Sequence, residues 1–331
     1  TEQPSSSPTF AQALSSRTIP LVILSFLVAV LYLVAFPVNL KLQEVSFASS
    51  SCSNDDATAA SSRQLAKQEP VDVRVFLGVI TRPDFYERRA HLRLAYSLQP
   101  RPVRAVVDVR FVFCNLDREE DRVLVAMEIV AHGDVVVLSN CTENMNDGKT
   151  YEYFHTIPRM FADEPYDYVG KTDDDAYYRL AALADTLRDK PRDSVYHGML
   201  IPCPGSLEWQ YMAGFGYIVS WDIAEWISAH EELRNDRGHE DMVFGQWVRK
   251  AGKFKNVYGQ EPRMYDYWDR ESTGEDVTCF RHELIADTVG VHKVKTRLKW
   301  ARMLNFFNAT QGLKPSKMYD VDRLKSNLYH V

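Results

Sequence analysis

Three adjacent carboxylates, Asp173, Asp174 and Asp175, come two residues after an apolar run in the middle of the chain. Neighbouring carboxylates repel one another when ionised, unless a cation or solvent relieves the repulsion. Alternate residues at the end of a strand share a face, so Asp173 and Asp175 can point to one centre. Two oxygen ligands of this kind suit Mg²⁺ or Mn²⁺, which then recruit phosphate oxygens. The other interpretation is a solvated acidic turn, but the position at the end of an apolar strand strengthens the case for a metal site.

A second acidic pair, Glu240-Asp241, precedes apolar residues at helical spacing, among them Val243, Phe244 and Trp247. The spacing predicts a helix whose first turn carries both carboxylates, where they favour the helix dipole whatever their function. The functional interpretation is a general base that the helix start holds toward a cleft. The pattern alone favours the simpler role at the helix start.

The segments around these clusters alternate between strands and helices. Apolar runs predict strands at 73–80, 109–114, 134–138 and 166–170. Between them, apolar residues at helical spacing predict helices around 92–98, 122–131 and 153–157. This alternation predicts an α/β fold with a mostly parallel sheet and helices on both faces. Such sheets bind ligands at the carboxyl ends of their strands, which is where the acidic triplet lies.

Two glycine-containing segments resemble nucleotide-binding loops, but neither fits. Residues 148–150 (GKT) end like a P-loop, yet Glu143 stands where the first glycine should be. Residues 214–216 (GFG) lack the third glycine of a dinucleotide loop and have no strand-to-helix setting. Neither segment is therefore a cofactor motif.

The composition is that of an ordinary folded protein. Of the 331 residues, 45% are hydrophobic and 25% are charged, which provides enough apolar material for a substantial core. The 39 basic and 45 acidic residues give a net charge of −6. Proteins that bind nucleic acid usually carry a basic excess, so the sequence argues against a nucleic-acid partner.

The apolar residues are unevenly spread, and no charged residue occurs between Arg17 and Lys41. As a helix, residues 19–40 would span about 33 Å, enough to cross the hydrocarbon core of a membrane. A buried core helix would carry a polar stripe, and a cleavable signal peptide usually has a shorter apolar region. We therefore predict a signal anchor at 19–40, a cytosolic tail at 1–18, a flexible stem at 41–70 and a lumenal body at 71–331.

The cysteines and the N-glycosylation motifs provide evidence about the cellular compartment in which the body lies. Four of the five cysteines lie in the body, at positions 114, 141, 203 and 279, and they allow up to two disulfides in three connectivities. No CxxC pair occurs, which argues against a zinc site built on thiolates. Asn140 and Asn308 each begin an N-glycosylation motif. Such motifs also arise by chance, but together with the anchor and stem they point to the secretory pathway.

Five blocks of the body, in this order and spacing, resemble the β-1,3-glycosyltransferases of glycosyltransferase family 31. That family includes β-1,3-galactosyltransferases, β-1,3-N-acetylglucosaminyltransferases and Fringe enzymes. The blocks are 76–78 (FLG) with 87–96 (ERRAHLRLAY), 111–113 (FVF), 168–175 (YVGKTDDD), 211–220 (YMAGFGYIVS) and 240–245 (EDMVFG). The resemblance covers residues 71–295, and the tail after His292 is typical of a plant-type member.

The resemblance implies a GT-A type fold, a Rossmann-like α/β sheet, here preceded by the N-terminal transmembrane helix. It implies an inverting reaction, in which a glycan hydroxyl attacks the sugar carbon of a UDP-sugar and UDP departs. The transferred sugar is galactose or N-acetylglucosamine, in β-1,3 linkage. By the same resemblance Asp241 is the catalytic base, while Asp175, helped by Asp173, holds Mn²⁺ or Mg²⁺. His292 matches a late histidine that ligates the metal in some relatives, although a lone histidine near a strand end is more often simply packed or exposed.

The resemblance also assigns residues to the donor and the acceptor. Arg88 and Arg93 are suited to holding the nucleotide or bracing its loop, with ordinary helix-surface charge as the alternative, and Asp174 is assigned to donor binding. Glycines at two positions would let the backbone approach a sugar, and aromatic side chains could stack on one, although aromatics are more often core. The predicted sugar or acceptor contacts are Trp209, Tyr211, Gly214, Gly216 and Glu240.

These observations lead to one main hypothesis and two rivals. The main hypothesis is a metal-dependent hexosyltransferase of the Golgi membrane, a single-pass type II glycoprotein with a lumenal catalytic domain, a UDP-sugar donor and a glycan or glycoprotein acceptor. The first rival is a catalytically silent Golgi protein of the same fold that binds glycans or a partner. The second is a metal-dependent hydrolase, which would release free sugar whether or not an acceptor is present. The intact acidic blocks favour the transferase.

Overall fold

The computed structural model describes residues 70–202, 210–268 and 280–311. Up to the acidic triplet, its elements are β1 (Val73–Ile80), η1 (Pro83–Phe85), α2 (Tyr86–Ser97), β2 (Ala105–Phe113), α3 (Glu119–His132), β3 (Val135–Val137), η2 (Met145–Lys149), α4 (Thr150–Met160) and β4 (Tyr168–Asp173). The elements after it are β5 (Tyr177–Tyr178), α5 (Leu180–Leu187), β6 (Val195–Ile201), β7 (Tyr211–Ser220), α6 (Trp221–Ser228), η3 (Glu231–Asn235), α7 (Glu240–Lys250), β8 (Asn256–Gly259), β9 (Met264–Tyr267), β10 (Arg281–His282), β11 (Gly290–His292) and α9 (Arg297–Phe306). The strands and helices predicted before the triplet are all present and differ only at their ends.

A seven-stranded sheet forms the centre of the fold, in the order β3-β2-β1-β4-β7-β6-β8. Neighbouring strands from β3 to β4 run parallel, as do β6 and β8, whereas β7 is antiparallel to both β4 and β6. The predicted α/β class with a mostly parallel sheet is therefore confirmed. β1 lies between two parallel neighbours and is buried on both faces, which explains its nearly continuous apolar sequence.

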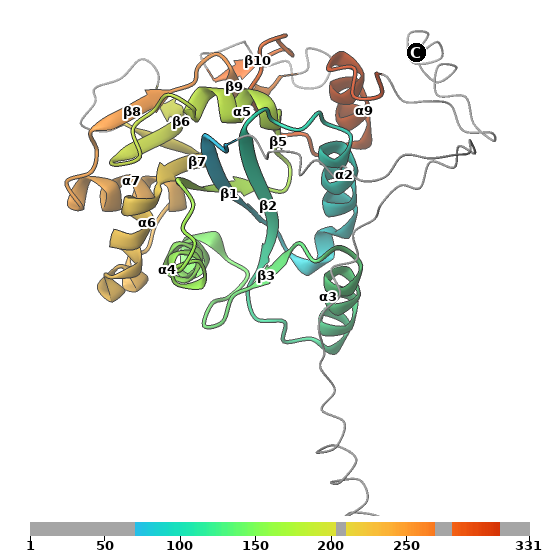
Figure 1. The fold of residues 1–331 in the computed structure, drawn as a ribbon. Helices are drawn as coiled ribbons and strands as arrows, with labels where there is room; N and C mark the ends of the chain where they lie inside the picture. Colours follow the sequence, from blue (N-terminus) through green and yellow to red (C-terminus); the bar gives the residue numbers. More distant parts are fainter. Residues whose placement is uncertain (1–69, 203–209, 269–279, 312–331) are drawn as a thin grey trace, which may run out of the picture. The chain divides into compact units, whose positions relative to one another are not determined.

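Helices cover both faces of this sheet (Figure 1). The side chains of β1 show the division, because successive residues of a strand point to opposite faces. Phe76 packs in a core with α4, α6 and α7, whereas Leu77 packs with α5 and Val79 packs with α2, α3 and α9. The predicted placement of helices on both faces is thus confirmed.

A smaller four-stranded sheet has the order β10-β9-β11-β5. Its strands are only two to four residues long, too short for a periodic sequence pattern, and the sequence did not predict them. β5 follows the acidic triplet directly and pairs antiparallel with β11, which pairs parallel with β9 on its other side. This sheet therefore brings a segment from late in the chain next to the triplet.

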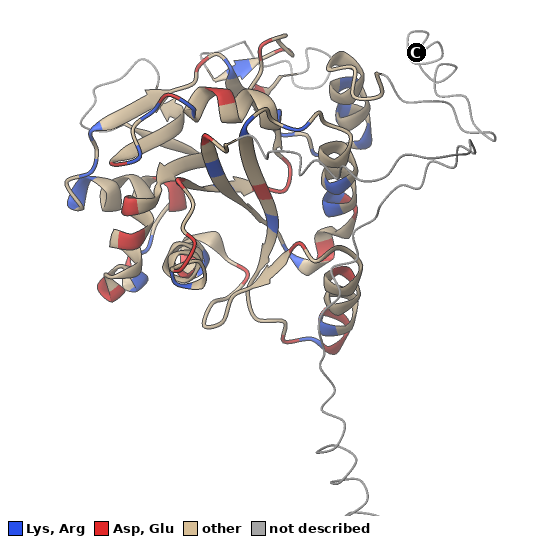
Figure 2. Cartoon of the chain, in the orientation of Figure 1, with Lys and Arg blue, Asp and Glu red and all other residues tan. Residues whose placement is uncertain are grey.

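An ion-pair network joins α2 to α3, where Figure 2 shows basic residues on α2 beside acidic residues on α3. The guanidinium of Arg89 donates to both carboxylate oxygens of Glu128, at 3.0 and 2.6 Å. Arg93 donates to the same carboxylate at 2.6 Å and to Asp134 at 2.8 Å. Burial opposes ionisation of Glu128, but the two guanidinium groups hold the pKa of this carboxyl below its usual range. The network fixes the position of α2 relative to α3.

Several predicted features fall on residues outside the described ranges. They include the tail at 1–18, the anchor at 19–40, nearly all of the stem at 41–70, and the cysteines at 52, 203 and 279. Among the residues that the structure describes, no helix is both long enough and apolar enough to cross a membrane. Cys114 and Cys141 form a disulfide that joins the end of β2 to the segment before η2, across 27 positions of the chain.

Candidate functional site

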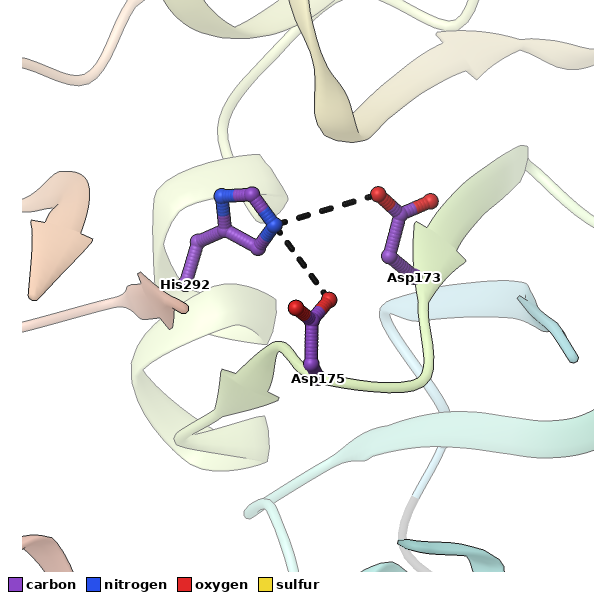
Figure 3. A group of neighbouring side chains, drawn as sticks. All are labelled: Asp173, Asp175 and His292. Atoms are coloured by element: carbon purple, nitrogen blue, oxygen red, sulfur yellow. Dashed lines mark ion pairs between the residues drawn. The ribbon is translucent and has the colours of Figure 1, made fainter. Parts of the chain in front are cut away.

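Asp173, Asp175 and His292 form a cluster whose potential ligand atoms all lie within 4.8 Å of one another (Figure 3). Nε2 of His292 lies 3.3 Å from Oδ1 of Asp175 and 3.9 Å from Oδ2 of Asp173. Asp175 is buried, while Asp173 and His292 are partly exposed, so the cluster remains accessible to a small ligand. The structure thus brings together the three residues predicted to hold a metal, and their role as ligands stays a prediction.

A turn after β4 makes the two aspartates converge. β4 ends at Asp173, and the backbone N–H of Ala176 donates to the carbonyl of Asp173 at 3.2 Å, which closes the turn before β5. Asp175 lies past the end of the strand, so this turn, and not alternation along the strand, turns its carboxylate toward that of Asp173. On the other side, the backbone N–H of Val294 donates to the carbonyl of Asp175 at 3.0 Å, which holds the end of β11 against the turn.

Asp266 on β9 supports the imidazole of His292. Its Oδ1 lies 2.7 Å from Nδ1 of His292, and its Oδ2 pairs with Nζ of Lys293 at 2.9 Å. The ring of Phe215 stacks on the imidazole, with the ring centroids 4.9 Å apart and the planes 9° from parallel. A histidine held in this way presents Nε2 to the aspartates, as carboxylates orient metal-binding histidines in other proteins.

The charges of the cluster fit a cation. Burial opposes the charged form of His292, but Asp175 and Asp266 raise its pKa to about 9. Burial likewise opposes ionisation of Asp175, but the hydrogen bond and charge of His292 lower its pKa to about 2. The protonated imidazole offsets the negative charge of the carboxylates. A divalent cation, when bound, would offset the same charge. Two carboxylate oxygens and one imidazole nitrogen suit Mn²⁺ and also accommodate Mg²⁺, so the residues present fit the predicted metal.

The middle carboxylate of the triplet has different partners. Asp174 accepts from Arg88 at 2.7 Å and from the hydroxyl of Thr81 at 2.8 Å. Burial raises the pKa of Asp174, against the opposing influence of Arg88 and Thr81. The guanidinium of Arg88 also lies 4.2 Å from the ring centroid of Phe85. Asp174 therefore pairs with Arg88, and both are predicted donor-binding residues. Of the triplet, only Asp173 and Asp175 belong to the cluster.

A cavity of about 530 Å³ is lined by the three cluster residues, by the carboxylates of Asp174 and Glu143, and by several cationic side chains that pair with these carboxylates or lie beside them. The cations are Arg82, Arg88, Lys149 and Lys295. Basic side chains gathered around one cavity suit a ligand with concentrated negative charge, such as a diphosphate. Phe85 adds an aromatic surface to the same wall. We call this space the cationic cavity.

Arg93 does not line the cationic cavity. Its guanidinium is occupied by Glu128 and Asp134 in the network between α2 and α3. Of the two predicted roles, holding the nucleotide or bracing its loop, this position favours bracing, because the network fixes the helix that carries Arg88.

A second cavity, of about 680 Å³, adjoins the first, and Asp173, His292, Met145 and Asn146 line both. Glu240 and Asp241 line this second space and not the first, and we call it the Asp241 cavity. Much of its remaining wall is apolar or aromatic, formed by Met199, Ile201, Pro202, Tyr211, Ala213, Phe215 and Phe280. We call Asp173, Asp175 and His292 together the cation cluster. This cluster therefore lies where the cationic cavity meets the Asp241 cavity, which offers a carboxylate and an apolar wall.

Asp241 lies in the first turn of α7, where the sequence predicted it. Its Oδ2 accepts from the backbone N–H of Gly214 at 3.0 Å, and its Oδ1 accepts from the backbone N–H of Met242 at 2.9 Å. A Cβ added at Gly214 would lie 3.2 Å from a carboxylate oxygen of Asp241 and 3.2 Å from one of Glu240. The glycine thus permits the close approach that fixes the carboxylate, and the role of Asp241 as a base stays a prediction.

Glu240 lines the same cavity and is held there by two neighbours. Its Oε1 accepts a hydrogen bond from the hydroxyl of Tyr217, and its Oε2 lies 3.3 Å from Nζ of Lys171. Burial raises the pKa of Glu240, while Lys171 and Tyr217 act in the opposite direction. Both carboxylate oxygens already have protein partners, and its predicted contact with a sugar stays a prediction.

The remaining predicted residues have varied surroundings. Tyr211 lines the Asp241 cavity, whereas Gly216 is packed against Tyr178, whose hydroxyl would lie 2.0 Å from a Cβ at that position. Trp209 lies outside the described ranges. Asn140 and Asn308 are both exposed, so a glycan could be attached to either without disturbing the core.

Sequence reasoning assigned no role to several residues that the structure places at the site, among them Arg82, Lys149 and Lys295 of the cationic cavity and the three described next. Lys171 belongs to block 168–175, which ends in the triplet. Its place in that block could have indicated that it lies at the site. Asn146 lines both cavities and accepts from the backbone N–H of Glu240 at 2.9 Å. Asp266 lies in the short strand β9 without a local pattern that distinguishes it. Only pairing of β9 with β11 reveals its contact with His292.

Comparison with curated proteins confirms the predicted enzyme class, and the chain is a glycosyltransferase. It is 25% identical over 289 residues to the β-1,3-galactosyltransferase pvg3 of Schizosaccharomyces pombe, a match that covers 71% of this chain and 74% of that protein. It is 27% identical over 138 residues to the probable β-1,3-galactosyltransferase 3 of Arabidopsis thaliana, which covers 35% of this chain and 33% of that protein. The predicted resemblance to the β-1,3-glycosyltransferases of family 31 is therefore confirmed.

Solved structures of glycosyltransferases overlap with the chain only loosely. A mannosyltransferase from Pyrobaculum calidifontis in complex with GDP-Man and Mn²⁺ is 13% identical, with a TM-score of 0.40, and the overlap covers 79% of this chain and 69% of that one. Mouse xyloside xylosyltransferase 1 is 11% identical, with a TM-score of 0.37, and the overlap covers 66% of this chain and 97% of that one. No protein-family model matches the chain.

Proposed function

We propose that this glycosyltransferase has a GT-A type fold and moves galactose or N-acetylglucosamine from a UDP-sugar to a glycan hydroxyl in β-1,3 linkage, with inversion at the sugar carbon. One observation carries the proposal: the cluster of Asp173, Asp175 and His292 lies where the cationic cavity meets the Asp241 cavity. A transferase needs such a junction, because the sugar carbon must face the leaving diphosphate on one side and the acceptor on the other.

The cationic cavity is assigned to the nucleotide diphosphate. Arg82, Arg88, Lys149 and Lys295 supply positive charge for the departing phosphate oxygens. Asp174 holds Arg88 in place through their 2.7 Å contact, so its contribution to donor binding is to position that guanidinium. A divalent cation bound by Asp173, Asp175 and His292 would act there as a Lewis acid that neutralises charge on the diphosphate.

The Asp241 cavity is assigned to the acceptor. The carboxylate of Asp241 takes the proton from the attacking hydroxyl, and the backbone donors at Gly214 and Met242 keep it oriented while it does so. The apolar and aromatic wall, which includes Tyr211 and Phe215, offers surfaces on which the face of a sugar ring can pack. A glycan acceptor therefore matches the chemistry of this wall.

We further propose a lumenal location in the Golgi, with the chain anchored as a type II membrane protein by residues 19–40 and extended by the stem at 41–70. The Cys114–Cys141 disulfide supports an oxidising compartment, because such bonds are rare in the cytosol. The exposed positions of Asn140 and Asn308 are compatible with glycosylation there. The folded body at 71–331 would then be the catalytic domain.

Release of UDP by the purified full-length chain tests the proposal. The chain is offered UDP-galactose, UDP-N-acetylglucosamine and related donors with a panel of glycan acceptors, in Mn²⁺ and again after chelation. We expect acceptor-dependent UDP release that chelation abolishes, and a product whose new linkage is β-1,3 by NMR. Asp241→Asn should lower kcat by about 100-fold to 10,000-fold while Mn²⁺ binding persists.

Two outcomes would contradict the proposal in different ways. Binding of UDP without turnover of any donor and acceptor pair would favour the catalytically silent alternative. Free sugar released at the same rate with and without acceptor would indicate a hydrolase. Undiminished turnover in Asp241→Asn would remove Asp241 as the base and leave the transferase itself in place.

A further inference from the structure

Lys171 is a charged side chain in the interior of the protein, and the proposed reaction does not yet use it. It lies on β4, two positions before Asp173, and its side chain is 0% exposed. Burial of an ammonium group is costly unless partners compensate for the lost water. Its partners therefore indicate what the fold gains by keeping a charge at this position.

Three acceptors surround the ammonium of Lys171. Nζ lies 2.8 Å from Oδ1 of Asp173 and 3.3 Å from Oε2 of Glu240, and it also donates to the carbonyl of Gly214. An ammonium has three protons, so these acceptors satisfy it completely. The side chain is thus a buried cation with a full set of partners.

These acceptors belong to both halves of the site. Asp173 offers Oδ1 to Lys171, while its Oδ2 faces Nε2 of His292 in the cation cluster. Glu240 begins α7 and stands directly before Asp241 in the chain. Gly214 receives Lys171 at its carbonyl and donates its N–H to Asp241 at 3.0 Å. One ammonium therefore touches the cation cluster and both the helix start and the strand that hold Asp241.

We propose that Lys171 is a positioning residue that sets which oxygen of Asp173 faces the cation and fixes the start of α7, with Asp241, relative to the cation cluster. The inference rests on the proposed function, since it gives Lys171 a task only if the cluster holds a cation and Asp241 acts on the acceptor. This positioning role differs from a role in charge balance alone. In that case Lys171 would do no more than neutralise the buried carboxylate of Glu240.

Two variants separate positioning from charge balance. Lys171→Met removes the ammonium and leaves Glu240 buried without its cation, which destabilises the fold under either role. Lys171→Met combined with Glu240→Gln removes the charge of the partner as well, so the buried pair becomes neutral. Gln keeps an oxygen that can accept from Tyr217. The double variant should therefore recover stability, but Asp173 still lacks the donor that orients it.

The test is made on the full-length protein with Mn²⁺ alone as the probe. Electron paramagnetic resonance of free Mn²⁺ gives the affinity, thermal unfolding gives the stability, and UDP release gives kcat and KM. We expect both variants to bind Mn²⁺ about 10-fold to 100-fold more weakly than wild type, the range for lost supporting contacts around metal ligands. The double variant should regain most of the thermal stability while its Mn²⁺ affinity stays low.

The control is Lys253→Met, which removes another lysine paired with a carboxylate, that of Asp222, on residues that line neither cavity. It should leave the Mn²⁺ affinity and kcat unchanged. Wild-type Mn²⁺ affinity and kcat in the double variant would overturn the positioning role and leave the proposed function standing. A wild-type chain that binds no Mn²⁺ would overturn the proposed cation site and the inference with it.

Discussion

Asp174 and Asp175 are neighbours in the chain, but their carboxylates have separate partners. Asp174 contacts Arg88 at 2.7 Å, whereas Asp175 contacts His292 at 3.3 Å and Lys295 at 3.5 Å. The turn that follows β4 makes this division, because the backbone changes direction between Asp173 and Ala176. Within one acidic triplet, Asp174 therefore holds Arg88 at the cationic cavity, while Asp173 and Asp175 belong to the cluster with His292.

The first prediction uses this division. Asp175→Ala should weaken Mn²⁺ binding by at least about 100-fold, because it removes one of the proposed ligands. The matched change Asp174→Asn should leave Mn²⁺ affinity unchanged and weaken the binding of UDP, because it loosens Arg88. Calorimetric titration of each variant with Mn²⁺, and then with UDP, measures both effects. Full Mn²⁺ affinity in Asp175→Ala would exclude the cluster as the cation site.

The second prediction concerns the close approach at Gly214. A Cβ at this position would lie 3.2 Å from carboxylate oxygens of both Asp241 and Glu240. Gly214→Ala should therefore displace the carboxylate of Asp241 and lower kcat by about 10-fold, since small misplacements of a catalytic group are costly. Gly133→Ala is the control: its φ of +62° strains the backbone, but nothing lies within 4 Å of the added Cβ. We expect it to lower stability without a change in kcat, and equal kcat values for both variants would contradict this account.

The third prediction concerns the disulfide. Cys114 and Cys141 close a loop of 27 positions, and the backbone N–H of Cys114 also donates to Glu143 at 2.7 Å. Replacing both cysteines by alanine should lower the free energy of unfolding by about 3 kcal/mol, chiefly because the unfolded chain loses a constraint. Urea unfolding of the wild type with and without dithiothreitol should show a similar difference. No change on reduction would mean that the bond contributes little to stability.

The fourth prediction concerns pH. His197 on β6 is 0% exposed, and in the described part of the chain neither of its ring nitrogens has a hydrogen-bond partner. Burial lowers its pKa from 6.5 to about 3. Between these values the unfolded chain binds a proton that the folded chain does not, so stability falls as the pH drops below 6.5. The loss attributable to His197 should approach about 1.4 kcal/mol per pH unit.

His197→Leu isolates this contribution from those of other titrating groups. Urea unfolding of wild type and variant at pH 7 and pH 5 gives the loss of stability on acidification for each. The loss should be smaller in the variant by about 2 kcal/mol, because the leucine takes up no proton in either state. The same loss in both proteins would show that His197 is protonated in the folded state.

Local sequence patterns were sufficient for β1 to β4 and for the helices between them, but the other three strands of the main sheet, β6, β7 and β8, were not predicted. Runs such as 73–80 are apolar because a central strand is buried on both faces, so composition alone identifies them. The first turn of α7 was also predictable, because helical spacing begins directly after Glu240-Asp241. The short strands β5, β9, β10 and β11 were not, because two to four residues carry no periodic pattern.

By itself, the sequence determined which residue types the site contains and the order in which they occur. The acidic triplet, the later acidic pair and the late histidine are fixed by their positions in the chain. The tertiary structure decided which of them meet. Pairing of β5 with β11 brings His292 to Asp175, and the burial of Lys171 between Asp173 and Glu240 connects the two acidic groups. Both relationships depend on contacts between distant segments, and those contacts exist only once the sheets have formed.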